Sequence, residues 1–366
     1  MSFAPEPTFQ HGSAARTGVL LVNLGTPDAP TAPAVRRYLA EFLSDARVVE
    51  LPRLLWLPIL HGIILRVRPA RSAAKYASIW TPQGSPLAHW TAAQAQALQT
   101  ALAASAATGV VVRQAMRYGQ PSVGAGLDAL KAAGCTRILV VPLYPQYSGT
   151  TTASVMDAVY DWGKTIRHLP ELRAVNRYHD HPGYIAALAE TVRAHRARSG
   201  RQGHLLMSFH GVPARTLELG DPYHCECHKT ARLLAQALGL GKDEWSLSFQ
   251  SRFGKAKWLE PSTEATLRAL AARGVHDLEV ICPGFVGDCL ETLEEIAIEG
   301  RETFLHAGGR SYDYIACLND HPLWIATLAK LVQTHCQGWP VGAPDAPAQA
   351  ALGGSRERAL ALGAAR

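Results

Sequence analysis

Short apolar segments alternate along the chain with longer segments of helical pattern. Six runs rich in Val, Ile and Leu are candidate strands: 18–24, 110–116, 137–143, 204–209, 245–249 and 278–282. Eight segments have helical patterns: 33–43, 87–106, 123–133, 152–162, 184–196, 229–238, 263–273 and 290–305. This alternation is typical of βαβ units, and continuous apolar strands fit burial on both faces of a sheet. The sequence therefore predicts an α/β fold with mostly parallel sheets flanked by helices.

The two halves of the chain repeat each other in the same order. The aligned pairs are 19–27 with 205–213, 116–119 with 251–254, 129–134 with 269–274, and 138–140 with 278–280. The preserved order favours duplication over chance similarity. We therefore predict two similar lobes, residues 17–175 and 176–336, with a ligand cleft between them at the carboxyl ends of the strands. Residues 1–16 are expected to form a disordered N-terminus and residues 337–366 a flexible tail.

The repeat isolates one histidine. His210 takes the position that Leu24 holds in the first half. It ends an apolar strand and precedes Gly211, which allows the chain to turn. Many isolated histidines near strand ends are only hydrogen-bonded core residues, but the predicted cleft at this edge favours a functional role for His210.

Composition and charge exclude several classes of protein. The net charge is +6, from 36 basic and 30 acidic residues, and no basic block is present, so we expect no nucleic-acid partner. The seven cysteines are not the framework of a small disulfide-rich protein, and they indicate a reducing compartment. No stretch reaches the roughly 20 apolar residues that a membrane span requires. We therefore expect a cytoplasmic protein.

The most apolar segment, Leu54–Val67, is interrupted by Pro58, His61 and Arg66. It is too short to span a bilayer, and it is either a core helix or a segment that rests on a membrane surface. Basic residues flank it, so the second interpretation predicts weak, salt-sensitive affinity for anionic lipid.

Six sequence blocks resemble the ferrochelatase family. Residues 205–223 join a Ser-x-His-Gly-x-Pro turn to a Gly-Asp-Pro-Tyr segment, which is similar to the family signature. The other matching blocks are 21–27, 84–86, 142–148, 250–252 and 283–293, and the resemblance covers roughly residues 17–335. It implies two Rossmann-like lobes around a porphyrin cleft. It also implies insertion of Fe²⁺ into protoporphyrin IX, which gives protohaem and two protons in the final step of haem biosynthesis.

The reaction requires a base for two pyrrole protons and ligands for the incoming iron. Imidazole serves either purpose, and the resemblance implies that His210 is the active-site histidine, as base or as metal ligand. It likewise implies that Glu291 is the active-site glutamate. Glu295 and Glu299 follow at four-residue spacing, which predicts one helix face carrying a possible proton or metal relay. Cys289 departs from the family pattern, since many relatives carry His there.

A rigid cleft must also grip the porphyrin. The candidate aromatic walls are Tyr118, Tyr144, Tyr147 and Phe249. Candidate partners for the propionates are Arg117, Ser148, Arg252 and Lys255, of which Arg252 is the first choice because it lies in a matching block.

The segment His224-Cys-Glu-Cys-His228 contains metal-ligating residue types, but its spacing is not that of a structural zinc site. Some relatives hold a [2Fe–2S] cluster through cysteines near the C-terminus. Here Cys336 stands alone in that region, so we predict no iron–sulfur cluster and no cofactor beyond the substrate Fe²⁺.

Three alternatives remain open. Two are enzymes of related chemistry: a coproporphyrin ferrochelatase and a cobalt chelatase of the same lobed fold. The third is a non-catalytic porphyrin- or haem-binding protein, which would need neither His210 nor Glu291. The presence of both residues favours catalysis.

Overall fold

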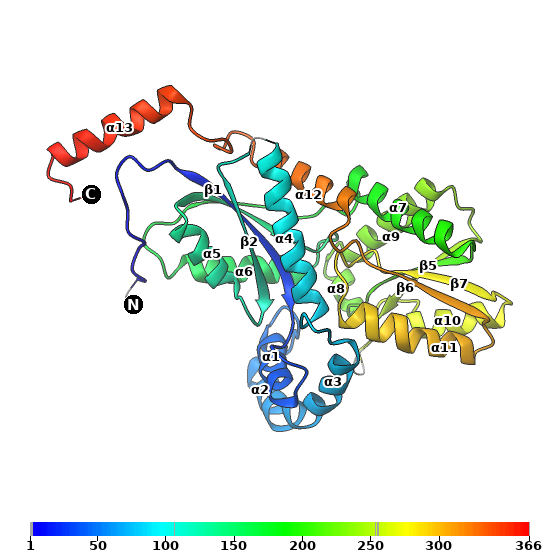
Figure 1. Cartoon of the computed structure of the whole chain (residues 1–366). Helices are drawn as coiled ribbons and strands as arrows, with labels where there is room; N and C mark the ends of the chain where they lie inside the picture. Colours follow the sequence, from blue (N-terminus) through cyan, green and yellow to red (C-terminus); the bar gives the residue numbers. More distant parts are fainter. Residues whose placement is uncertain (1–2, 106, 253, 255, 366) are drawn as a thin grey trace.

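The chain folds into two four-stranded parallel sheets (Figure 1). The structure is a computed structural model of the chain and describes residues 3–105, 107–252, 254 and 256–365. The first sheet has the order β2-β1-β3-β4, with strands β1 (Arg16–Gly25), β2 (Val110–Tyr118), β3 (Cys135–Pro142) and β4 (Glu171–Ala174). The second has the matching order β6-β5-β7-β8, with strands β5 (His204–His210), β6 (Trp245–Gln250), β7 (Asp277–Ile281) and β8 (Ser311–Ile315).

The predicted α/β fold with two similar lobes is confirmed, as are the six predicted strands. The edge strands β4 and β8 were missed. Each has only four or five residues, and polar residues interrupt its apolar pattern. A strand that is half-buried at a sheet edge does not need a continuous apolar run, so this signal was missing from the sequence.

One face of each sheet contributes to a single core that joins the two lobes. The helices packed into this shared core are α4 (Pro86–Ala104), α7 (Pro182–Ser199), α9 (Tyr223–Leu238) and α12 (Pro322–His335). The opposite face of each sheet is packed against its own set of helices. On the first sheet these are α5 (Val123–Ala132) and α6 (Ser154–Gly163), the latter preceded by the π-helix η2 (Gly149–Ala153). On the second they are α10 (Thr263–Ala272), α11 (Arg301–His306) and the π-helix η3 (Glu291–Gly300).

The last helix of each repeat packs against the other lobe. Both α7 and α12 begin with a His-Pro pair, in which His181 or His321 caps the helix by accepting a backbone N–H. Helix α7 packs on α9 of the second lobe, whereas α12 packs on α4 of the first (Figure 1). Helix α12, which was placed in the second lobe, therefore also belongs to the packing of the first, and the boundary after residue 175 stays a prediction.

The strand register corrects one part of the predicted repeat. Backbone pairing sets Asn23 opposite Met116 and Phe209 opposite Phe249. Since β1 and β5 are equivalent strands, Met116 is the counterpart of Phe249. Both residues also donate their backbone N–H to a proline carbonyl after the strand, Pro121 or Pro261.

The predicted alignment of 116–119 with 251–254 is therefore wrong by two residues. The cause is the connection after the strand, which is longer in the second lobe and leaves a similar Arg-aromatic-Gly pattern at a different structural position. By the register, Arg117 corresponds to Gln250 and Tyr118 to Ser251.

A glycine occupies the same position at the carboxyl end of β1 and directly after β5 for a steric reason. A Cβ atom at Gly25 would lie 1.7 Å from the Tyr118 carbonyl oxygen, and one at Gly211 would lie 2.6 Å from the Gln250 carbonyl oxygen. Real Cβ atoms do not approach so closely, so each strand ends against its neighbour only with glycine there.

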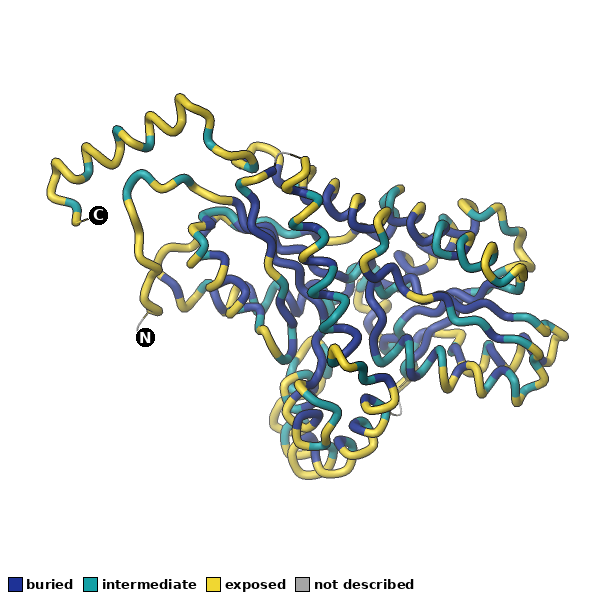
Figure 2. Tube along the Cα trace, in the orientation of Figure 1, coloured by how far each residue is buried: buried dark blue, intermediate teal, exposed yellow. Residues whose placement is uncertain are grey.

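A helical insertion between β1 and α4 distinguishes the first lobe. This insertion, here called the lip, consists of α1 (Ala32–Ser44), α2 (Arg53–Ile59), the π-helix η1 (Leu60–Ile64) and α3 (Leu65–Ile79). It has its own small core and projects from the two lobes (Figure 1). Its outer surface is exposed (Figure 2), and Leu54 is 91% exposed. Within the described ranges, no helix is both long and apolar enough to cross a membrane.

Both ends of the chain have defined contacts. The Ala4 N–H donates to the Thr165 carbonyl oxygen at 2.8 Å, and Glu6 forms an ion pair with Lys131. Beyond α12 the chain returns to the first sheet, where the Gly109 N–H donates to the Val341 carbonyl oxygen, and then forms the exposed helix α13 (Ala346–Ala361). The structure thus gives local order to segments for which the sequence predicted disorder and flexibility.

Candidate active site

His210 lies at the carboxyl end of β5, next to the turn at Gly211. Its Nδ1 donates a hydrogen bond to the Gly211 carbonyl oxygen at 2.6 Å. This bond assigns the proton of a neutral ring to Nδ1 and leaves the lone pair on Nε2. The side chain is half-buried, and its ring centroid is 6.4 Å from that of Phe285. The fold therefore holds the imidazole in one orientation with a basic nitrogen available.

Glu295, on η3, is anchored beside His210 by the end of β6. Its Oε1 accepts the Ser251 N–H at 2.6 Å, and its Oε2 accepts the Ser251 hydroxyl and the Gln250 amide. Burial raises the pKa of this carboxyl group, and the nearby charge of Glu291 adds to the increase, while Ser251 and His210 oppose it. A carboxyl group with a raised pKa next to an imidazole is suited to exchange a proton with it.

Glu291 begins η3 and lies close to the lip. Burial raises the pKa of the Tyr76 phenol, and the Glu291 charge raises it further. The same charge acts on the phenols of Tyr38 and Tyr144 and on the guanidinium of Arg68. The charge of Glu291 is thus felt by buried phenols of the lip and by Tyr144, which follows β3.

Cys289 takes the place of the histidine that many relatives carry. It is buried, and burial together with the neighbouring Glu291 carboxylate raises the pKa of its thiol well above the ordinary value. The thiol therefore stays protonated near neutral pH, where it is a hydrogen-bond partner of Glu291. A protonated thiol does not relay protons as an imidazole does.

The predicted row of three glutamates is only partly present. Residues 291–300 form a π-helix rather than an α-helix, so residues five apart fall together. Glu294 and Glu299 have this spacing and both bind Lys75, at 3.0 and 2.8 Å. The structure therefore brings Glu291 and Glu295 to the site, whereas Glu299 forms a surface ion pair.

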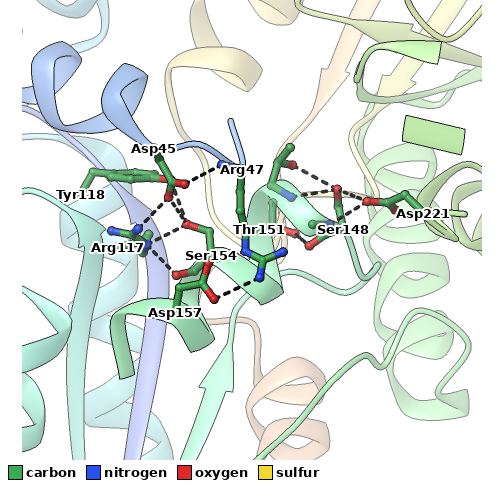
Figure 3. Close-up of polar contacts among 11 residues, drawn as sticks. Asp45, Arg47, Arg117, Tyr118, Ser148, Thr151, Ser154, Asp157 and Asp221 are labelled. Atoms are coloured by element: carbon green, nitrogen blue, oxygen red, sulfur yellow. Dashed lines mark hydrogen bonds and ion pairs between the residues drawn. The ribbon is translucent and has the colours of Figure 1, made fainter. Parts of the chain in front are cut away.

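The equivalent position in the first lobe is occupied by a partly buried ion pair between Arg117 and Asp45 (Figure 3). Oδ2 of Asp45 accepts hydrogen bonds from Arg117 at 2.6 Å, Ser154 at 2.6 Å and Tyr118 at 2.8 Å. Burial tends to raise the pKa of Asp45, but these hydrogen bonds and the Arg117 charge outweigh it and lower the pKa. Arg117 is engaged here, so its predicted role as a propionate partner is not supported by this arrangement.

Three predicted porphyrin contacts are instead internal. Tyr118 is fully buried with its hydroxyl bonded to Asp45 and Ser154. Phe249 is also buried, on the face of the second sheet opposite Gln250, because side chains alternate along β6. The Ser148 hydroxyl donates to Asp221 at 3.0 Å (Figure 3).

The remaining predicted contacts lie at separate places. Tyr144 is near Glu291, and its buried hydroxyl has no hydrogen-bond partner within the described part of the chain. Tyr147 lines a separate cavity of about 580 Å³ beside η2, where Arg177 lies over its ring. Arg252 is exposed, and Lys255 lies outside the described residues. The role of Tyr144 as an aromatic wall stays a prediction.

The His224–His228 segment does not converge on one metal. It lies on α9, where Glu226 and Cys227 point into the core and Cys225 is exposed. Only the rings of His224 and His228 lie together, with centroids 4.4 Å apart. Among the described residues no group of three His, Cys, Asp or Glu side chains is arranged to hold a metal ion.

Several residues near the site were not predicted. Tyr38, Tyr76 and Arg68 come from the lip. Nothing in the sequence of these helices indicated that all three lie near Glu291. Gln250 and Ser251 lie in a block that matched the family, and their position directly after an apolar strand was the available signal.

Comparisons with known proteins match the whole chain. The family model described as "Ferrochelatase" matches residues 16–336. The chain is 64% identical over 370 residues to "Ferrochelatase" of Polaromonas sp., with 100% of both chains covered. It is 62% identical over 364 residues to "Ferrochelatase" of Methylibium petroleiphilum, which covers 100% of this chain and 99% of that protein.

The chain belongs to the ferrochelatase family. The family match ends where α12 ends, so α13 lies beyond the matched region. A solved structure, "SirB from Bacillus subtilis with Fe3+", has a similar fold, with a TM-score of 0.50, 12% identity and coverage of 88% of this chain and 96% of that chain. The two-lobed architecture is therefore shared more widely than the ferrochelatase sequence blocks.

Proposed function

We infer that this chain is a ferrochelatase that inserts Fe²⁺ into protoporphyrin IX, giving protohaem and two protons, the final step of haem biosynthesis. The observation that carries this function is the position of Glu295, anchored by Ser251 at the end of β6, where its carboxyl group is affected by the charges of both His210 and Glu291. The whole-length match to the ferrochelatase family supports the same activity.

His210 has the first chemical role. Its Nε2 lone pair, left available by the bond from Nδ1 to Gly211, accepts a pyrrole proton as the ring nitrogens turn toward the metal. The neighbouring Glu295 has a raised pKa, so it takes that proton onward and restores the neutral imidazole. The same Nε2 atom is the competing candidate for ligation of the incoming Fe²⁺.

Glu291 has the complementary role at the lip side. Its carboxylate is a hard oxygen ligand for Fe²⁺ before insertion, and the Cys289 thiol donates toward it. Tyr38 and Tyr76 lie in the buried core of the lip, so they support this side of the site from behind and do not form its surface.

The decisive experiment measures turnover of the purified protein with Fe²⁺ and protoporphyrin IX. Parallel reactions with coproporphyrin III, and with Co²⁺ and sirohydrochlorin, test the two alternative chelatases. Porphyrin binding without turnover would instead support a non-catalytic binding protein. We also propose that no iron–sulfur cluster is bound, so anaerobically purified protein should lack the visible absorbance of such a cluster.

We further propose a cytoplasmic enzyme whose lip makes weak contact with anionic membranes. The seven cysteines are unpaired, which fits a reducing compartment. The lip exposes large apolar side chains, namely Leu54, Leu55, Ile59, Ile63 and Val67. Exposed arginines lie on the same helices, and basic residues of this kind attract anionic lipid.

A further inference from the structure

A second groove lies at the outer edge of the second sheet. It has a volume of about 600 Å³ and is formed by α9, the edge strand β6 and α10. It uses the first half of β6, including Leu247, whereas His210 pairs with Gln250 at the other end of that strand. Leu247 and Gln250 are three residues apart, or roughly 10 Å along a strand. The groove is therefore distinct from the candidate active site.

The groove combines apolar walls with two cations. Leu247, Leu270, Ala265 and Ala269 are among its apolar lining residues. Lys242 and Arg273 also line it, and neither forms an ion pair within the ranges that the structure describes. A volume in the range of small-molecule sites, an apolar surface and two uncompensated positive charges suit an apolar ligand with two carboxylates.

His228 adds an iron-binding group to this groove. It is exposed and lies on α9, where its ring neighbours those of His224 and Phe249, with centroids 4.4 and 6.3 Å away. Burial lowers the pKa of the His228 imidazole, and the neighbouring His224 lowers it further. The ring is therefore neutral near pH 7, which is the form that ligates iron.

We propose that this groove binds haem, with His228 ligating the iron and with Lys242 and Arg273 pairing with the two propionates. Haem matches each feature of the groove: its macrocycle is apolar, its two propionates are anionic and its iron accepts an imidazole ligand. The site goes beyond the proposed function, in which haem is the product, and would let the enzyme sense that product outside the active site.

The test is a titration of the purified full-length protein with haemin, followed by absorbance. Wild-type protein should show a histidine-ligated haem spectrum that is lost in His228→Ala and retained in His210→Ala. The double variant Lys242→Gln/Arg273→Gln should keep the histidine-ligated spectrum but bind about tenfold more weakly, as expected for the loss of two charge-assisted contacts. His224→Ala is the matched control, since His224 does not line the groove, and its haem affinity should stay close to that of wild type.

An unchanged spectrum and stoichiometry in His228→Ala would overturn the proposal. So would equal displacement of haemin by palmitate in wild type and His228→Ala, which would indicate a fatty-acid groove instead. The rate of iron insertion by His228→Ala should match that of wild type when a haem-binding protein removes the haem as it forms, because the groove is then empty in both proteins. If wild type shows no turnover but His228-dependent haem binding persists, the proposed function fails while the haem site stands.

Discussion

The two lobes place different side chains at equivalent positions. The first strand of each lobe carries Leu24 or His210 at or near its carboxyl end. The helical segment after the third strand carries Ser154, the first residue of α6, or Glu295 in η3. In both lobes the end of the second strand binds that helical residue, through Arg117 and Tyr118 in the first lobe and through Gln250 and Ser251 in the second.

The difference lies in what completes each cluster. In the first lobe Asp45 enters from the lip and satisfies the arginine, so the polar groups neutralise one another (Figure 3). In the second lobe no cation is paired with Glu295 among the described residues, and its neighbour is the imidazole of His210. The same framework thus holds an ion pair on one side and, on the other, a carboxyl group of raised pKa beside an imidazole, which is the pair for which we propose proton transfer.

The largest expected effect on turnover comes from removing the imidazole at the end of β5, where the first lobe has no titratable side chain. His210→Ala should lower iron insertion about 10²–10⁴-fold, the range for loss of general acid–base catalysis, while porphyrin still binds. Steady-state turnover and porphyrin fluorescence quenching measure the two properties. His276→Ala, which changes an exposed histidine on the same lobe, is the control. Turnover near the wild-type rate in His210→Ala would refute the assignment.

Asp45 and Glu295 should affect stability in opposite senses. The folded pKa of Asp45 lies below its ordinary value of 3.8, so the ionised group stabilises the protein above that pH, and the stabilisation is lost as the pH falls through the folded pKa. The folded pKa of Glu295 lies above its ordinary value of 4.5, so the folded state binds its proton more tightly and stability falls as the pH rises above 4.5.

Asp45→Asn should therefore cost roughly 1–3 kcal/mol at neutral pH, because it leaves the partly buried Arg117 without its charged hydrogen-bond partner. Glu295→Gln should lower the free energy of unfolding most near pH 4. As the pH rises, the variant should gain stability relative to wild type. Denaturant unfolding of both variants at pH 4 and pH 7.5 measures this. Parallel pH dependences in the two variants would contradict the comparison.

Glu291 has no charged counterpart in the first lobe, since the residue four positions before Ser154 is Thr150. Glu291→Gln should lower turnover about 10²-fold, because the amide keeps the size of the side chain but carries neither proton nor charge. Thermal melting should change little, since the side chain is only half-buried. A melting temperature that falls together with the activity would favour a structural role for Glu291.

The repeat was the strongest guide that the sequence offered. It predicted two lobes, and it singled out His210 because the aligned strands β1 and β5 differ there. The same strategy gave a wrong register for residues 251–254, because the loop after β6 is longer than its counterpart and a short motif is similar by chance. Strand pairing, which depends on backbone geometry, was needed to find the true equivalents.

Single-residue roles were harder to predict from the sequence. Tyr118 and Phe249 looked like cleft walls because they are aromatic and lie near strand ends, yet burial assigns both to cores. Glu299 followed Glu291 at α-helical spacing, but nothing in the sequence indicated the π-helix that turns it toward Lys75. The lip residues near Glu291 are distant in sequence, so their convergence depends on the folded chain.

The lip is the largest asymmetry between the lobes, since β5 and β6 are joined only by α8 (Ala214–Glu218) and α9. Substitutions of exposed apolar side chains in the lip should have the smallest effect, on vesicle binding alone. Leu54 and Ile63 are exposed, whereas Trp56 is half-buried and its Nε1 donates to the Leu43 carbonyl oxygen at 2.6 Å. Leu54→Ser/Ile63→Ser should therefore weaken binding to anionic vesicles without lowering the melting temperature, while Trp56→Ser should destabilise the lip.

Vesicle binding should also decrease with salt, because each basic residue near an anionic surface contributes on the order of 1 kcal/mol that ions screen. Sedimentation with phosphatidylserine vesicles at low and high salt measures this, and Leu219→Ser, an exposed apolar residue of the second lobe, is the matched control. The lip assignment predicts that only the lip variant loses binding. Equal binding by wild type, Leu54→Ser/Ile63→Ser and Leu219→Ser would show that the apolar surface of the lip does not contact the membrane. The exposed apolar side chains of the lip would then be explained by ligand access to the site near Glu291.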